Sequence, residues 1–135
     1  MLDKIKFAGF DIMGSQFELN GKPKGKGYYT INVEVGDIFL VDEELGAYCI
    51  DVLAALTGHE EGSDEPGFTA EAKLAVNFTV QDKELNISDG FYRDNAWFFD
   101  SYIAIVVKQS LENLLHFTPL NGIVLPTYPS NVKHV

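Results

Sequence analysis

Alternation of apolar and polar residues is the main pattern in the first eighty residues of the chain. In residues 29–35 large apolar side chains occupy every second position, with polar ones between them. Residues 48–57 alternate in the same way, and the pattern is longest in residues 68–81, where only Ala75 interrupts the polar set. Successive side chains of a strand point to opposite faces of a sheet, so each segment predicts a strand with one buried face.

The chain before these segments predicts a further strand and a loop. Residues 4–20 alternate less regularly, and the Gly14-Ser15 pair predicts a bulge or bend in a long strand. Residues 21–27 are rich in glycine and lysine, a composition typical of a loop. A phosphate-binding loop is excluded there, because Gly27 stands where such a loop carries serine or threonine.

The pattern changes after Asp94, where polar residues recur every three or four positions and predict a long helix. Asp100 is the expected N-cap of this helix, since its carboxylate can accept hydrogen bonds from amides of the first turn. Residues 118–135 contain three prolines and are expected to be extended and irregular. The predicted fold class is α+β: a four-stranded antiparallel sheet followed by one long helix packed on it, with an extended C-terminal tail.

Length and composition favour a single domain covering residues 1–135. The chain has a mass of 15.0 kDa, is 46% hydrophobic and 22% charged, and is long enough to bury a core without a disulfide or a metal. Cys49 lies in an apolar stretch and is expected to be a buried thiol. We expect a cytoplasmic location, because the first residues lack the apolar core of a signal peptide and no run approaches the length of a membrane span.

Acidic residues dominate the charge of the chain, which is −10 overall. Residues 27–72 hold eleven acids and neither lysine nor arginine. This charge repels phosphate backbones and anionic lipid surfaces, so we expect no nucleic-acid partner and no direct membrane insertion. Two interpretations of the acidic segment remain open: a solvated surface that keeps the protein soluble, or a docking surface for a basic partner.

Candidate catalytic and metal-ligating residues are few. His59 precedes an acidic loop, but a lone histidine there lacks the ligand set of a zinc or calcium site, so no metal is expected. Cys49 has no spaced histidine partner, and Asp100 beside Tyr102 would serve as an acid or base only if buried. We therefore expect neither enzymatic activity nor a cofactor.

Aromatic residues make up 13% of the chain, more than four strands and one helix need for a core. A surplus of this kind predicts an interface between copies of the chain, or a groove for apolar segments of another protein.

Several local sequences carry a family resemblance. Residues 10–19 form an opening strand that ends in Phe17-Glu18, and residues 31–35 alternate cleanly. Residues 97–102 lead into the long helix, and residues 117–126 contain Phe-Thr-Pro-Leu followed by Leu-Pro. In this order the segments resemble the bacterial export chaperone SecB and its SecB-like relatives. The sequence departs from that family in the first helical turn, which lacks its usual proline, and in the tail, where no second helix is predicted.

The resemblance implies an ATP-independent holdase, a dimer of dimers without a cofactor. Such a protein binds unfolded polypeptides or preproteins in apolar grooves and delivers them to the protein-export machinery. By position, the client-binding candidates are Phe7, Phe10, Phe17, Tyr28 and Tyr29. The acidic residues expected to form a negative face toward a translocation ATPase are Glu34, Asp37 and Asp51.

Three other functions fit the same pattern. A SecB-like chaperone of a toxin–antitoxin module would take an antitoxin as its partner. An interaction protein with the same fold would form oligomers but ignore unfolded clients. A hotdog-like enzyme acting on a small ligand would need Asp100 or Asp51 in a closed pocket.

Overall fold

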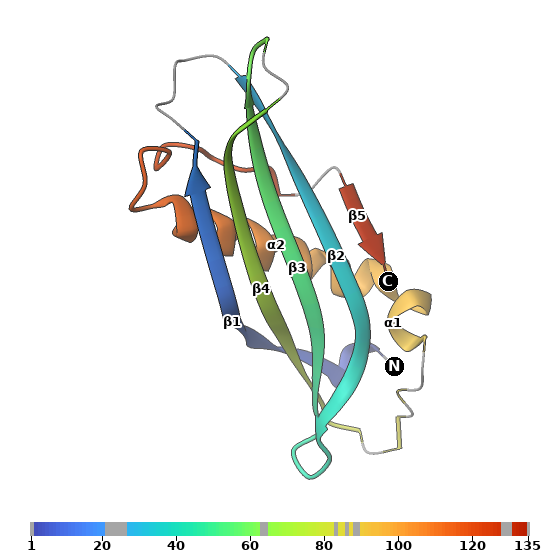
Figure 1. Ribbon diagram of the computed structural model, residues 1–135. Coiled ribbons are helices and arrows are strands. Elements are labelled where there is room, and N and C mark those ends of the chain that lie inside the picture. The colour runs from blue at the N-terminus through green and yellow to red at the C-terminus, as the bar shows by residue number, and fades with distance from the viewer. Residues whose placement is uncertain are drawn as a thin grey trace.

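The computed structural model consists of an elongated, twisted sheet with a long helix across one face (Figure 1). It describes residues 2–20, 27–62, 65–82, 84–85, 87, 90–127 and 131–134. A short 3-10 helix at Leu2–Lys4 opens the chain. The strands are β1 (Ile5–Leu19), β2 (Gly27–Asp42), β3 (Ala47–Glu60), β4 (Pro66–Val80) and β5 (Asn131–His134), and the α-helices are α1 (Phe91–Asp94) and α2 (Ala96–Leu115).

The sheet is five-stranded and mixed, with the order β1-β4-β3-β2-β5. Strands β1 to β4 pair in antiparallel fashion, whereas β5 runs parallel to β2 and pairs with residues 32–35. The expectation of a purely antiparallel four-stranded sheet with an irregular tail was therefore incomplete. The three prolines of the tail all precede β5, so its amides remain free to join a ladder.

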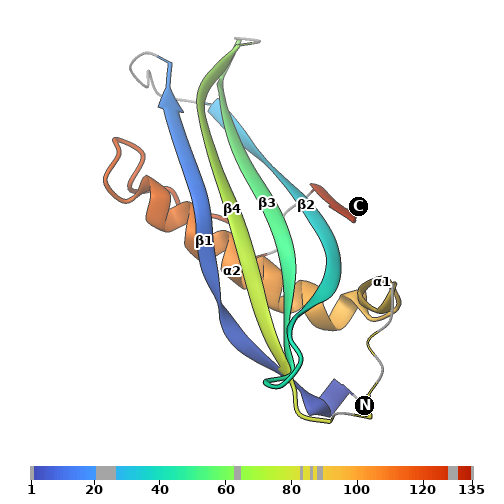
Figure 2. The ribbon, with the colours of Figure 1, turned by 60° about the horizontal axis from the view of Figure 1, so that its bottom comes forward.

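The alternation predicted which strand residues face the core. In β2, Ile31, Val33 and Val35 are buried, while Asn32 and Glu34 between them are exposed. Helix α2 packs on β4, β1 and β3, and α1 packs on β2 (Figures 1 and 2). We call the face that α2 covers the helix-side face and the opposite one the outer face.

The first strand is long and irregular, as the sequence predicted. Its register against β4 shifts twice, between Phe7 and Phe10 and again between Ile12 and Gly14. Gly9 has a φ of +95°, which L side chains rarely adopt, and it lies at the first shift. After the second shift β1 pairs regularly as far as Leu19.

Helix α2 begins at Ala96, four residues before the predicted cap. Asp100 lies within the helix, so the prediction that it is the N-cap was wrong. The carboxylate of Asp100 accepts a hydrogen bond from the Tyr92 hydroxyl instead of from amides of the first turn. The β-branched Ile103, Val106 and Val107 disfavour a helix by themselves, but all three are buried in the core, and that burial outweighs their propensity.

The chain after α2 is anchored to the helix. The Lys108 ammonium donates to the Leu125 carbonyl at 2.7 Å, and the Leu125 amide donates to Glu112 Oε1 at 3.0 Å. The Leu125 side chain is buried in the core. These contacts hold the segment that leads toward β5 against helix α2 (Figure 1). Within the residues that the structure describes, no helix is long and apolar enough to cross a membrane.

Candidate functional site

One row of residues crosses the helix-side face near the β3–β4 turn. Leu19, Phe68, Gly58 and Tyr29 face one another in consecutive strand pairs of β1, β4, β3 and β2. The Phe17 ring lies next to this row, with its centroid 6.4 Å from that of Phe68. The Tyr29 side chain is 37% exposed, so this end of the face is only partly covered.

Tyr28 adds an aromatic ring to the same end of the sheet, but on the outer face, because it precedes Tyr29 in the strand. It pairs with His59 across β2 and β3, and the two rings stack with centroids 5.0 Å apart and planes 18° from parallel. Tyr28 is 59% exposed, whereas the Nδ1 atom of His59 is buried and has no hydrogen-bond partner among the described residues. We call Phe17, Tyr28, Tyr29 and Phe68 together the aromatic end.

Phe7 and Phe10 lie elsewhere on the helix-side face. The Phe7 ring stacks on Tyr102 of α2 with centroids 5.1 Å apart, and it meets Phe78 edge-on at 5.8 Å. Phe10 pairs with Val76 and is partly buried against the core. The partners of Phe7 and Phe17 on β4 are eight positions apart. That spacing corresponds to roughly 26 Å along a strand, so the five client-binding candidates do not form one cluster.

The three acidic candidates also differ in their surroundings. Glu34 and Asp51 are exposed on the outer face, where Glu34 lies opposite Lys133 of β5 and Asp51 opposite Ala75 of β4. Both carboxylate oxygens of Asp37 are hydrogen-bonded: one accepts from the Ile38 amide and the other from the Gly90 amide, each at 2.8 Å. Asp37 therefore joins β2 to the residue that precedes α1.

A cluster that the sequence did not reveal joins α1, α2 and β5. The Tyr92 hydroxyl donates to Asp100 Oδ1, and His134 Nε2 lies 3.2 Å from Asp100 Oδ2. The Tyr92 side chain is 1% exposed, and its burial is the main cause that raises its pKa, followed by the hydrogen bond to Asp100. The only sequence signal was the polarity of Asp100 on a helix whose neighbouring residues are apolar.

The outer face holds the free cysteine. Burial raises the pKa of the Cys49 thiol to about 11, and the negative charges of Asp51 and Asp11 add to this effect. The thiol is therefore protonated at neutral pH and is a poor nucleophile. No group of three or more potential metal ligands occurs within the described ranges.

Further apolar side chains are exposed on α2 and on the segment after it. Trp97 and Ile105 of α2 are 71% and 55% exposed, and Phe117 and Val124 are 93% and 76% exposed. The C-terminal end of α2 and the segment that follows lie near the end of β1 that carries Phe17 (Figures 1 and 2). The segment after α2 thus carries exposed apolar residues of its own.

Comparisons with known proteins identify a structural likeness. No family profile matches the sequence, and no curated protein matches it. Among solved structures, a SecB-like chaperone of Mycobacterium tuberculosis in complex with a peptide of the HigA1 antitoxin aligns with a TM-score of 0.69. It is 14% identical, and the alignment covers 92% of this chain and 90% of that one. A protein of unknown function from Streptococcus agalactiae, 12% identical, aligns with a TM-score of 0.47 over 90% of this chain and 96% of that one. The first likeness shows that the chain has a SecB-like fold.

Proposed function

We propose that this protein is a SecB-like chaperone that holds unfolded polypeptides without ATP. The observation that carries the proposal is the aromatic end, where Tyr29 is 37% exposed on the helix-side face and Tyr28 is 59% exposed on the outer face. The SecB-like fold supports it, because the structural neighbour from M. tuberculosis is a chaperone and was solved with a bound peptide. The proposal includes no enzymatic step and no cofactor.

The chemistry of the aromatic end suits clients of many sequences. Aromatic rings offer large apolar area and, in tyrosine, a hydroxyl that can still bond to water or to a peptide. Burying such area releases water whatever the partner's sequence, so recognition needs only an exposed apolar segment. Phe117 on the segment after α2 offers a further exposed aromatic ring, since it is 93% exposed.

A dedicated antitoxin peptide is the second candidate partner. The specific observation in its favour is that the neighbouring chaperone of the same fold binds a peptide of an antitoxin. An extended peptide of that kind would use the same aromatic end but with a defined sequence. Delivery of clients to an export ATPase, with Glu34 and Asp51 of the outer face as the docking residues, is a further part of the proposal.

We also propose a cytoplasmic homo-oligomer. Strand β1 is the terminal strand of the sheet on its side, and it runs for 15 residues. Pairing of two copies along this edge, with the exposed Trp97 and Ile105 of α2 covered in the same assembly, would bury both features. Sedimentation of the purified protein tests this part, and a monomer at micromolar concentration would contradict it.

Light scattering of a denatured protein tests the holdase. Citrate synthase diluted from denaturant should stay soluble at near-stoichiometric amounts of this protein without nucleotide. The double variant Tyr28→Ser, Phe117→Ser should lose most of this effect, because it removes exposed apolar area without opening the core. Phe39→Ser is the matched control, since Phe39 is 45% exposed and lies on the outer face opposite Cys49, away from the aromatic end.

The outcomes separate the candidates. Equal protection by the double variant and the control would show that the aromatic end is not the client surface. Absence of protection by the unaltered protein would contradict a general holdase. A stable oligomer that ignores citrate synthase but binds one defined peptide would favour the dedicated partner.

A further inference from the structure

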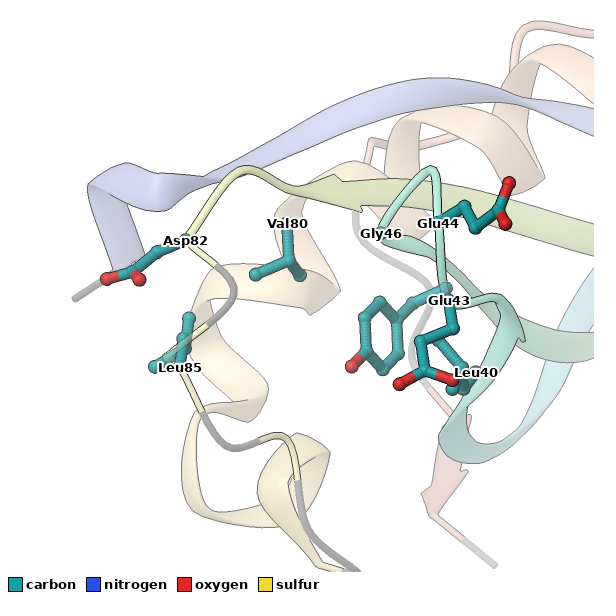
Figure 3. A pocket seen from close by; sticks show the side chains of 8 residues that line it. Leu40, Glu43, Glu44, Gly46, Val80, Asp82 and Leu85 are labelled. Atoms are coloured by element: carbon teal, nitrogen blue, oxygen red, sulfur yellow. The ribbon is translucent and has the colours of Figure 1, made fainter.

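A second surface feature lies at the opposite end of the helix-side face. A hollow of about 380 Å³ opens between the β2–β3 turn and the segment that follows β4 (Figure 3). The described residues that line it are Leu40, Glu43, Glu44, Gly46, Tyr48, Val80, Asp82 and Leu85. Tyr48 and Gly58, which faces Tyr29, are ten positions apart on β3, so roughly 33 Å separates the hollow from the aromatic end.

Apolar side chains form part of the wall of the hollow. Leu40 pairs with Tyr48 across β2 and β3, and these residues face the same side as Phe78 of β4. In Figure 3, Leu40 and Leu85 lie on opposite sides of the hollow, and Val80 projects between them. Leu40 is 48% exposed, so the hollow offers apolar surface that the chain itself leaves open to solvent.

Carboxylates surround this apolar wall. Figure 3 shows the Glu43 carboxylate beside Leu40 and the Asp82 carboxylate beyond Leu85, while Glu44 projects away from the hollow. Oδ1 of Asp82 accepts the Glu84 amide at 3.0 Å, which holds that side chain in place. Neither lysine nor arginine occurs among the described lining residues, and Lys83, which follows Asp82 in the sequence, lies outside the described residues.

The turn that carries Glu43 is well defined. Gly46 has a φ of +63°, its carbonyl accepts the Val80 amide at 2.8 Å, and a Cβ there would lie 2.3 Å from the Val80 carbonyl oxygen. Asp42 Oδ1 accepts the Leu45 amide at 3.2 Å. The acidic side of the hollow is therefore held against β4 before any partner binds, which lowers the entropy lost on binding.

We propose that this hollow is a docking site for an arginine or lysine side chain of a partner polypeptide. The apolar wall matches the methylene stem of such a side chain, and the carboxylate of Glu43 matches its cationic head. A polypeptide is favoured over a free cation because Val41 and Leu45 of the same segment are 61% and 72% exposed. Apolar residues that flank the basic residue would cover them. This site is separate from the proposed client surface.

Peptide binding measured by fluorescence anisotropy tests the proposal. The probe is a labelled pentapeptide with one arginine between two leucines and two valines. The same peptide with citrulline in place of arginine keeps the shape and removes the charge. We expect the arginine peptide to bind about tenfold more tightly than the citrulline peptide, and added salt to reduce the difference.

Protein variants locate the site. Glu43→Gln should weaken binding of the arginine peptide about fivefold and leave binding of the citrulline peptide unchanged. Leu40→Ser should weaken binding of both peptides. Glu61→Gln is the matched control, because Glu61 is an exposed acid just beyond the other end of β3 and should have no effect. Circular dichroism of each variant establishes that it is folded.

Three results would overturn the proposal. These are equal affinities for the two peptides, equal binding by the Glu43→Gln and Glu61→Gln proteins, or binding of free arginine amide as tight as that of the peptide. The assay contains no unfolded client, so its result does not depend on whether the protein holds clients. A holdase that fails this peptide test would still retain its proposed function.

Discussion

The ring of Phe68 occupies the space that a side chain at Gly58 would fill. A Cβ at residue 58 would lie 2.0 Å from Phe68 Cε1 and 2.4 Å from its Cδ1. The absence of a side chain on β3 thus lets an aromatic ring of β4 lie over Gly58, the residue that pairs with Tyr29, and this contact shapes the aromatic end.

Gly58→Ala should displace the Phe68 ring and destabilise the protein. We expect the free energy of unfolding to fall by about 1–3 kcal/mol, the usual cost of inserting a methyl group into a packed site. Urea denaturation measures the change. Gly14→Ala is the control, since a Cβ there meets only Cδ of the Lys73 side chain, at 4.0 Å. Equal stability of the two variants would contradict this account of the contact.

Tyr92→Phe should be more destabilising than its small change in volume suggests. The substitution removes the hydroxyl that donates to Asp100, and leaving a partly buried carboxylate without this donor costs about 1–3 kcal/mol. Tyr102→Phe is the control, because the Tyr102 hydroxyl makes no hydrogen bond within the described residues. Thermal unfolding of both variants, followed by circular dichroism, gives the comparison.

Tyr92 should also resist ionisation in the folded protein. Burial and the Asp100 carboxylate raise the pKa of its hydroxyl above the ordinary value of 10.0. A raised pKa in the folded state means that the unfolded chain loses this proton first, so stability from this group falls as pH rises above 10. An ultraviolet titration should show a phenol that ionises only on unfolding, and its absence in Tyr92→Phe identifies the residue.

The Cys49 thiol should react slowly with iodoacetamide at pH 8. Its pKa of about 11 in the folded protein, against an ordinary 9.0, keeps the thiolate fraction low. The reaction rate should keep rising up to about pH 11. The folded state should lose stability as the pH rises from 9 to about 11, because the thiol of the unfolded chain ionises first. The same protein in denaturant, with an exposed thiol, is the control; equal rates in both states would refute the prediction.

Glu112→Gln should loosen the segment after α2. The Lys108 ammonium and the Leu125 amide both bond to the Glu112 carboxylate, and these contacts hold its pKa below the ordinary 4.5. Because this carboxylate is partly exposed, we expect a loss of about 1 kcal/mol at neutral pH. The stabilisation is present above the unfolded pKa and disappears as pH falls through the folded one. Urea denaturation should therefore show a larger difference between variant and parent at pH 7 than at pH 3, and Glu71→Gln should show none at either.

The sequence was informative wherever a strand has one buried face. Strands β2, β3 and β4 were predicted because burial imposes a period of two on residues such as Ile31, Val33 and Val35. Strand β5 was missed, since four residues are too few for a period and parallel pairing depends on the position of the β2 edge. The start of α2 was misplaced because Asp100 bonds to Tyr92, a contact that no local pattern indicates.

The candidate site was only partly predictable, because pairing register decides which residues meet. Phe7 and Phe17 share a strand and a face, but two register shifts and the length of β1 set them far apart. In the sequence Asp37 is an acidic strand residue like Glu34 and Asp51. In the structure its carboxylate accepts a hydrogen bond from the Gly90 amide. Contacts of this kind join segments distant in the chain, so composition and spacing cannot reveal them.

Strand β5 limits which edge of the sheet can pair with a strand of another chain. It occupies the middle of the β2 edge, so a continuous ladder with another strand along β2 is blocked at residues 32–35. On the other side β1 ends the sheet with fifteen residues of edge. If two copies pair through β1, the long edge strand of each copy is covered. The edges that remain are the two β2 edges, and β5 interrupts each of them. In the proposed homo-oligomer, strand addition would therefore end at two chains and would not propagate into a fibre.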